Sequence, residues 1–379
     1  MRIAINTRLL LPGHLDGIGW FTAETVRRMV QQHPEHHFIL FFDRKVQIPW
    51  SAPNMEQVVL MPPARHPVLW YLFFEWSITN ALKRYKADIF LSTDGWLSLR
   101  TTVPILTVIH DLNFEHATDY LRPSHQRYMT HYFPRFARKA TRIATVSEFS
   151  RHDIASLYHI SPDKIDVVYN GSHNNYQPCS AATIQATRQR YADGHPYFIF
   201  IGTISKRKNL TNQLLAFDQF KDHDTEQTRF IVVGNRYWWG EELQQAYEGM
   251  RHKDDVVFMG RVEPDELAQM LSASIALAFA SYFEGFGIPI IEAFAAETAV
   301  ITANTTSMPE VAGDAALLVD PHNVDSIADA FTKLATQPEL RQTLIERGRQ
   351  RRLLFNWEQT SERLWQSLLK THQQSCSQK

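Results

Sequence analysis

Short apolar runs alternate with longer amphipathic stretches along the whole chain. In the first half, runs rich in Ile, Val and Phe cover residues 3–5, 38–42, 89–91, 105–109, 143–146 and 165–169. The second half repeats the scheme at 197–201, 230–233, 256–259, 275–279, 299–301 and 316–319. Runs this short, with little strict alternation, are typical of parallel strands that are covered on both faces. The stretches between them, such as 209–220, have the length of helices.

Strands that alternate with helices predict right-handed crossovers and doubly wound sheets, whose ligands bind outside the carboxyl ends of the strands. We therefore expect an α/β protein with two Rossmann-like domains, at 1–175 and 196–354. The polar stretch 176–195, with Pro178 and Gly194, is the expected linker. The chain is helical after Pro338, and we expect the helix 355–379 to pack back on the first domain.

Composition excludes several classes of protein. The 379 residues suffice for roughly two to three domains, and 39 basic against 40 acidic residues argue against nucleic acid as a partner. Cys179 and Cys376 lie far apart, which argues against a disulfide framework or thiolate metal centre and suits a reducing cytosol. No apolar run reaches the ~18 residues of a membrane helix, and the amino end is interpreted as a strand and not a signal peptide. We expect a cytoplasmic protein.

The segment 284–292, Glu-Gly-Phe-Gly-Ile-Pro-Ile-Ile-Glu, is the strongest local signal. Its glycines permit close backbone approach, Pro289 suits the first turn of a helix, and N–H groups at a helix start attract phosphate or sugar oxygens. Glu284 and Glu292 flank that site and can accept hydrogen bonds from sugar hydroxyls. A strand-to-helix turn with solvated acids is the alternative interpretation.

Two cations follow the strand 197–201 and Gly202. Arg207 and Lys208 open a helix, where they can neutralise a diphosphate beside the helix amino terminus. If they were only surface cations, their positive charges would be slightly unfavourable there, because the amino end of a helix carries a partial positive charge. We therefore favour a binding role.

Near the amino end, residues 13–19 form a glycine turn before a helix. Gly17 and Gly19 would let bare N–H groups approach phosphates, but Thr22 stands where the dinucleotide fingerprint has its third glycine. NAD binding is thus weakly supported, and a purely structural turn is the alternative. His110 and Asp111 end the run 105–109, where an α/β sheet presents functional residues, although a histidine there can also be merely hydrogen-bonded.

Other chemistries lack their motifs. His33, His36 and His37 cluster in a helix-to-strand turn without paired ligands at metal spacing. Neither a P-loop nor a Gly-x-Ser-x-Gly elbow occurs, which removes the commonest ATPase and hydrolase interpretations.

Together these residues resemble family 4 of the retaining glycosyltransferases. The Glu, seven residues, Glu arrangement with its internal Gly-Phe-Gly looks like that family's signature. The stretch 202–210 resembles its diphosphate-binding turn, 307–321 its late donor-domain segment, and the glycine turn at 13–19 its amino-terminal loop. The resemblance covers essentially the whole chain. It implies the GT-B fold, with an acceptor-binding first domain, a donor-binding second domain and the active site in the cleft between them.

The resemblance also implies roles for residues. Arg207 and Lys208, with the backbone around Gly287, would hold the donor diphosphate, while Glu284 would hold the sugar and Glu292 the ribose. Many members have an Arg directly after the glycine, where this chain has Thr203, so Arg207 would supply the second charge. His110 would stabilise charge at the anomeric carbon and Asp111 would orient it. Further donor contacts are expected from Gly17, Gly19, Gly202, Thr203, Arg261, Val262, Phe286 and Ile288.

The implied activity is transfer of a hexose from a nucleotide diphosphate sugar to an acceptor hydroxyl with retained configuration. We favour mannose from GDP-mannose, and a glycan or lipid-linked acceptor in surface polysaccharide or glycolipid synthesis. No cofactor or metal is expected, because the cations take the metal's place and no likely donor loop has an Asp-x-Asp motif. A UDP-sugar transferase, a sugar-nucleotide 2-epimerase of the same fold and a non-catalytic nucleotide-sugar-binding protein are the alternatives.

A peripheral contact with the inner face of the membrane is a further hypothesis. Residues 122–151 contain seven basic residues and one acid, and aromatic residues gather nearby at Trp70, Tyr71, Phe73, Phe74 and Trp76. Such a set suits anionic headgroups or a lipid diphosphate. The alternative is a helix that packs on the sheet beside solvated basic residues.

Overall fold

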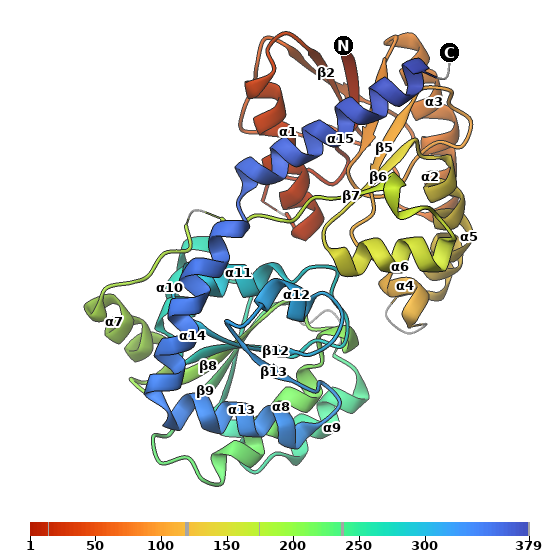
Figure 1. Cartoon of the computed structure of the whole chain (residues 1–379). Helices are drawn as coiled ribbons and strands as arrows, with labels where there is room; N and C mark the ends of the chain where they lie inside the picture. Colours follow the sequence, from red (N-terminus) through yellow and green to blue (C-terminus); the bar gives the residue numbers. More distant parts are fainter. Residues whose placement is uncertain (14, 118–120, 174, 236–238, 378–379) are drawn as a thin grey trace. The chain divides into compact units, whose positions relative to one another are not determined.

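The computed structural model describes residues 1–13, 15–117, 121–173, 175–235 and 239–377. They divide into two compact units, one made of Met1–Asn170 with Trp357–Lys379 and the other of Gly171–Asn356 (Figure 1).

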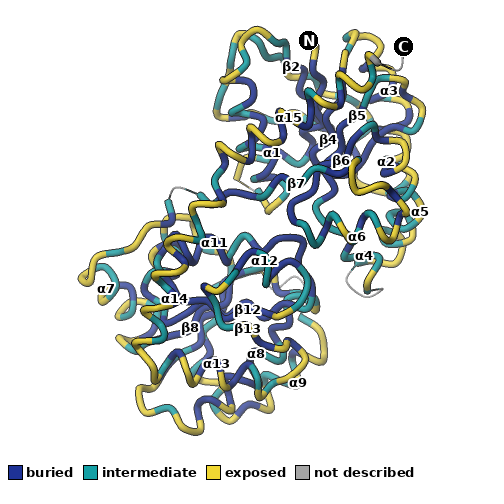
Figure 2. Tube along the Cα trace, in the orientation of Figure 1, coloured by how far each residue is buried: buried dark blue, intermediate teal, exposed yellow. Residues whose placement is uncertain are grey.

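The first unit is built on a parallel sheet with the strand order β3-β2-β1-β4-β5-β6-β7. Its strands are β1 (Arg2–Asn6), β2 (His37–Phe42), β3 (Met55–Val59), β4 (Ile89–Ser92), β5 (Ile105–Val108), β6 (Arg142–Thr145) and β7 (Ile165–Val167). The inner strands β4, β5 and β6 are buried throughout (Figure 2), whereas the edge strand β3 is partly exposed. Burial on both faces explains why the inner strands are continuous apolar runs. The strand order reverses between β1 and β4, which makes their carboxyl ends the topological switch point.

Helices cover this sheet. They are α1 (Gly17–Gln32), α2 (Pro67–Leu72), the π-helical turn η1 (Phe73–Ile78), α3 (Thr79–Arg84), α4 (Asn113–His116), α5 (Pro123–Lys139), α6 (Glu148–Tyr158), the short turn η2 (Pro162–Lys164) and α15 (Trp357–Ser377). The apolar cluster beneath α2 and α5 contains Phe73, Phe74, Phe133 and Phe136. Helices α1 and α15 pack against each other (Figure 1).

The second unit contains a parallel sheet with the order β10-β9-β8-β11-β12-β13. Its strands are β8 (Tyr197–Ile201), β9 (Arg229–Val233), β10 (Val256–Gly260), β11 (Ala276–Phe279), β12 (Ala299–Ala303) and β13 (Leu317–Val319). The helices and short turns are α7 (Ala181–Ala192), η3 (Lys206–Lys208), α8 (Leu210–Lys221), α9 (Glu241–Gly249), η4 (Lys253–Asp255), α10 (Pro264–Ala273), α11 (Ile288–Ala295), α12 (Met308–Ala312), α13 (Val324–Thr336), α14 (Pro338–Arg351) and η5 (Arg352–Leu354). Each of the two units thus combines a parallel sheet with helices, which confirms the predicted α/β fold class.

The structure refines the expected boundaries. The whole of the expected linker 176–195 belongs to the second unit, where α7 packs on α10 and the Arg188 Nε donates to the carbonyl of Ala273 at 2.9 Å. The last helix, α15, belongs to the first unit. There the Thr360 hydroxyl donates to the carbonyl of Tyr169 at 2.7 Å.

Candidate functional site

The turn after β8 is shaped by two glycines whose backbones touch. Gly202 has φ +151° and Gly234, directly after β9, has φ +152°. A Cβ on Gly234 would lie 1.8 Å from the carbonyl oxygen of Gly202, so only glycine fits. The chain then runs through η3 into α8 and carries Arg207 and Lys208 to the carboxyl edge of the second sheet.

Arg207 and Lys208 meet the same carboxylate. The Arg207 Nη1 lies 2.8 Å from the Glu284 Oε2, and the Lys208 Nζ lies 2.7 Å from the Oε1. Arg207 also donates to the carbonyl of Phe283 at 2.6 Å, and the Lys208 Nζ lies 4.7 Å from the centre of the Phe279 ring. The structure thus brings together three of the four predicted catalytic side chains, with two positive charges on one negative charge.

These contacts decide the charge of Glu284. Burial alone would raise the pKa of Glu284, but the charges and hydrogen bonds of Arg207 and Lys208 outweigh it and lower the pKa to about 2. Glu284 is therefore an anion across the physiological range. As a carboxylate it only accepts hydrogen bonds, which suits it to hold hydroxyl groups.

The loop that carries Glu284 is fixed by its own backbone. The Ser307 hydroxyl donates to the carbonyls of Glu284 and Phe286, at 2.8 Å and 3.1 Å. Gly287 has φ +101° and precedes the first residue of α11, with Ile288 and Pro289 in the first turn. The sequence therefore produces the predicted strand–loop–helix step, which places the Gly287 backbone at the amino end of α11.

Glu292 is in a different electrostatic setting on α11. Its side chain is buried and accepts a hydrogen bond from the Tyr176 hydroxyl. Burial raises the pKa of Glu292 to about 7, and the Tyr176 hydrogen bond offsets only part of this effect. Sequence reasoning missed Tyr176, because it was assigned to the boundary of a polar linker.

Three further predicted donor contacts, Thr203, Arg261 and Val262, lie in the second unit. Thr203 is exposed directly after Gly202, and Arg261 is exposed and Val262 half-buried directly after β10. Because all strands of the sheet are parallel, these residues and Glu284 follow carboxyl ends on the same edge. Their roles toward a ligand stay predictions.

His110 follows β5 in the first unit, as predicted. Its Nε2 lies 2.9 Å from the carbonyl oxygen of Thr93, so this nitrogen donates, and the Ser150 hydroxyl donates to the carbonyl of His110 at 3.2 Å. Burial lowers the pKa of His110 and outweighs the opposing hydrogen bond and nearby acids. The ring is therefore neutral at physiological pH, with the lone pair on Nδ1.

The prediction that Asp111 orients His110 needs correction. Asp111 Oδ1 accepts from the backbone N–H of Asn113 at 3.1 Å and from its side-chain amide at 2.6 Å. The carbonyl of Thr93 holds the ring instead, and Asp111 contributes its charge.

The glycine turn also differs from the expectation of bare N–H groups. Gly17 is the exposed first residue of α1, whereas Gly19 is buried and its N–H donates to the Asp16 carboxylate at 2.8 Å. Asp16 is thus the N-cap that starts α1. His14, within the predicted turn, lies outside the described residues.

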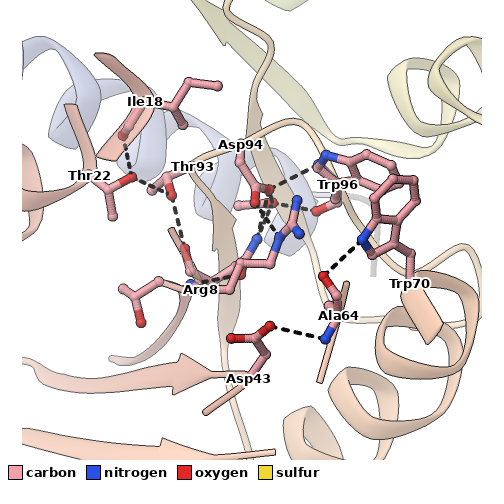
Figure 3. Close-up of polar contacts among 12 residues, drawn as sticks. Arg8, Ile18, Thr22, Asp43, Ala64, Trp70, Thr93, Asp94 and Trp96 are labelled. Carbon is pink, nitrogen blue, oxygen red and sulfur yellow. Dashed lines mark hydrogen bonds and ion pairs between the residues drawn. The ribbon is translucent and has the colours of Figure 1, made fainter. Parts of the chain in front are cut away.

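A buried polar network that sequence reasoning missed surrounds the switch point of the first sheet (Figure 3). Asp94, after β4, accepts from the Arg8 Nε at 2.6 Å and from the Asn6 side chain at 2.8 Å. The Thr22 hydroxyl donates to the Thr93 hydroxyl at 2.8 Å, next to the carbonyl that holds His110. The signal for it was present, since Asn6 to Arg8 and Ser92 to Asp94 directly follow two adjacent apolar runs.

Two absences apply to the described residues only. Among residues 1–13, 15–117, 121–173, 175–235 and 239–377, no three His, Cys, Asp or Glu side chains gather so as to hold a metal ion. In that same part of the chain, no helix has the length and apolar character needed to cross a bilayer. Metal-independent catalysis stays a prediction.

Both halves of the chain match known families. Residues 15–173 match Glycosyltransferase Family 4, and residues 184–351 match Glycosyl transferases group 1. The Escherichia coli O-antigen chain mannosyltransferase B is 28% identical over 356 residues, which are 91% of this chain and 93% of that protein. The O-antigen chain mannosyltransferase RfbU of Salmonella typhimurium is 25% identical over 294 residues, 76% of this chain and 77% of that protein.

A solved structure shows the same fold. Sucrose-phosphate synthase from Thermosynechococcus elongatus aligns with a TM-score of 0.77 and 19% identity, over 97% of this chain and 98% of that one. At this identity the likeness concerns the fold alone.

Proposed function

This chain belongs to the family 4 glycosyltransferases and has their GT-B fold, and we propose that it moves mannose from GDP-mannose to an acceptor hydroxyl with retained configuration. The acceptor would be a growing glycan or a lipid-linked sugar in surface polysaccharide synthesis. Two mannosyltransferases that act on O-antigen chains support the sugar and the acceptor class.

The single observation that carries the proposal is the cluster of Arg207, Lys208 and Glu284. Two cations on one carboxylate leave one net positive charge at the carboxyl edge of a parallel sheet, where α/β folds bind ligands. A donor diphosphate carries the complementary charge, and a guanidinium and an ammonium are the usual partners for its oxygens.

In this proposal the cations stabilise the leaving group. Negative charge grows on the nucleoside diphosphate as the glycosidic bond breaks, and fixed cations in a water-poor site lower the energy of that state. Arg207 is held by the carbonyl of Phe283 and by Glu284, so little reorganisation is needed when charge develops. The cations thereby take the role that a metal ion has in other transferases.

The two glutamates bind different parts of the donor. Glu284, ionised at all physiological pH values, accepts hydrogen bonds from sugar hydroxyls. Glu292, on α11, accepts a hydrogen bond from the ribose, and the backbone at Gly287, before the first residue of α11, approaches the diphosphate. Thr203, Arg261 and Val262 would complete the contacts along the same edge.

The first unit supplies the acceptor side. We propose that His110 acts at the anomeric carbon and that the turn at Gly17 and Gly19 contributes contacts to the donor. His110 is neutral, so its Nδ1 or carbonyl group can stabilise positive charge on the sugar ring without repelling it. The departing phosphate would take the proton of the acceptor hydroxyl, which keeps reaction on one face of the sugar.

A thermal-shift screen tests the donor. The protein is melted with GDP, UDP, ADP and their sugar conjugates, with and without EDTA, since a ligand of the folded state must raise Tm. We expect GDP and GDP-mannose to raise Tm, and we expect each shift to be the same with EDTA as without it. A shift with UDP alone would correct the base, a shift abolished by EDTA would overturn metal independence, and no shift with any nucleotide would overturn the donor site.

A further inference from the structure

The turn η3 carries Arg207 and Lys208, yet it has little stability of its own. It is a single 3₁₀ turn of three residues, a kind of helix with poor hydrogen-bond geometry. All three of its residues are basic, and cations are unfavourable before the amino end of the next helix, α8. The position of the two cations must therefore be fixed by contacts from other parts of the second unit.

One pair of hydrogen bonds joins the turn to the loop of its carboxylate partner. The backbone N–H of Tyr282, two residues before Glu284, donates to the carbonyl of Arg207 at 2.9 Å. Arg207 donates in return from its guanidinium to the carbonyl of Phe283 at 2.6 Å. The turn and the loop are thus linked through both backbone and side chain.

Gln213, on α8, holds the turn from the other side. Its Nε2 donates to the carbonyls of Lys208 and Asn209, at 3.0 Å and 2.9 Å. Its Oε1 accepts from the N–H of Ala280, directly after β11, at 3.4 Å. Gln213 is completely buried, and a buried amide is costly unless both of its ends are hydrogen-bonded. Here one end binds the turn and the other binds the strand that leads to Glu284.

Asn209 joins the turn to two further points of the sheet edge. Its backbone is left-handed, with φ +54°, a conformation that asparagine tolerates better than most residues. Its buried Nδ2 donates to the carbonyl of Ala280 at 2.9 Å and to that of Pro321 at 2.8 Å. Ala280 follows β11 and Pro321 follows β13. One side chain therefore ties the end of the turn to two strand ends.

These amides serve the turn and not the helix that follows it. Asn209 is the N-cap residue of α8, where an asparagine side chain usually accepts from the N–H groups of the first helical turn. Within the described part of the chain its side chain makes no such capping bond. At 213 an apolar side chain would fill the buried position without the cost of burying an amide. Formation of α8 thus explains neither residue.

We propose that Asn209 and Gln213 are positioning residues, whose amides hold Arg207 and Lys208 where both cations meet Glu284 and face the donor diphosphate. They act through the cations and need no contact of their own with the donor. Charge that develops on a leaving group is stabilised best by groups that are already in place. The expected effect on rate rests on the proposed function, whereas the position of the cations can be measured without any nucleotide.

Two variants and one control test the proposal on the full chain. Gln213→Met keeps the length and burial of the side chain and removes the amide. Asn209→Gly keeps a residue that adopts positive φ and removes the amide. The control, Asp218→Ala, removes a buried acceptor farther along α8, whose Oδ1 accepts from the N–H of His252 at 2.8 Å. All proteins are compared below the lowest Tm, so that each is folded during the measurements.

The first readout is the titration of Glu284 in the free protein. Carbon-13 NMR of labelled glutamate follows its carboxyl group, which is assigned with Glu284→Gln. The pKa of Glu284 is about 2 because Arg207 and Lys208 contact it, so in the wild type and the control it should stay ionised down to about pH 4. In Gln213→Met and Asn209→Gly the cations lose their support, burial dominates, and Glu284 should take up its proton above that pH.

The second readout is the rate of GDP release from GDP-mannose with acceptor. In Gln213→Met and Asn209→Gly kcat should fall about tenfold or more, as expected when stabilising groups are misplaced. KM should rise less than kcat falls, because the charge on the diphosphate is greatest in the transition state. Asp218→Ala should keep the kcat of the wild type.

The outcomes separate the positioning role from the donor site. The proposal is overturned if Glu284 in both variants stays ionised down to about pH 4, whatever their rates, or if the control loses as much rate as they do. A moved titration with no GDP release by the wild type would support the positioning contacts and contradict the proposed function. A moved titration together with a selective fall in kcat would support both.

Discussion

Glu292 should make the second unit less stable as pH rises toward neutrality. Its pKa is about 7 in the folded chain against the ordinary value of 4.5. Each pKa unit corresponds to 1.36 kcal/mol, so the buried charge destabilises the folded state by about 3 kcal/mol once Glu292 is ionised. Replacement by glutamine removes the charge, keeps the shape and leaves an oxygen that can accept from Tyr176.

The direction follows from proton binding. Between pH 4.5 and about 7 the folded chain holds a proton on Glu292 that the unfolded chain has released. The contribution of this group to stability is therefore fully present below pH 4.5 and is lost as pH rises through about 7. Glu292→Gln lacks this loss, so the variant and the wild type should be similar near pH 5 and differ by about 3 kcal/mol near pH 8.

The assay must report the second unit alone, because a chain of two units need not unfold in one step. Urea titrations at the two pH values can be read by hydrogen exchange of peptides that cover β11 and β12. The same pH dependence in Glu292→Gln and wild type would refute the assignment of a raised pKa to this carboxyl.

Three further changes follow from specific contacts. Tyr176→Phe removes a hydrogen bond that favours ionised Glu292, so the stability loss should move to higher pH in the same urea assay. Gly234→Ala places a Cβ 1.8 Å from a backbone oxygen and should lower the free energy of unfolding in urea by about 3 kcal/mol or more. The control Gly240→Ala, with open space around the new Cβ, should leave that free energy nearly unchanged. Equal effects of the two changes would contradict the contact. Trp365→Ala removes a buried ring stacked 3.7 Å from that of His33 and should destabilise the first unit by about 3–5 kcal/mol, seen as faster hydrogen exchange in α1 and α15; unchanged exchange would show that α15 does not depend on this ring.

The sequence was most informative where burial is complete. Residues 197–201 were predicted as a strand from five consecutive apolar residues, and β8 has those bounds. The edge strand β3 was missed because Met-Glu-Gln-Val-Val carries polar residues on a partly exposed face. The predicted cluster of Arg207, Lys208 and Glu284 followed from a general property of parallel sheets, whose carboxyl ends share an edge.

Side-chain partners were harder to predict, because a sequence gives positions and not rotamers. Asp111 lies next to His110, yet its carboxylate caps Asn113, and a backbone carbonyl holds the imidazole. The sequence predicts a free backbone N–H at Gly19, but this group donates a hydrogen bond to the carboxylate of Asp16, three residues earlier. Tyr176 reaches Glu292 from a segment more than a hundred residues away in the chain, and no local pattern marks such a contact.

The central claim is that the cation pair acts on the diphosphate of a mannosyl donor, and Lys208→Ala tests it most directly. The rate of GDP release from GDP-mannose is measured with a membrane polysaccharide fraction as acceptor. The proteins compared are the wild type, Lys208→Ala and the control Lys206→Ala, which changes an exposed residue of the same turn. We expect acceptor-dependent release that Lys206→Ala retains and Lys208→Ala lowers by about 100-fold or more, as for loss of one stabilising group in other enzymes. Equal rates in the three proteins would contradict the account, and release of a 2-epimer without acceptor would assign the chain to epimerases instead.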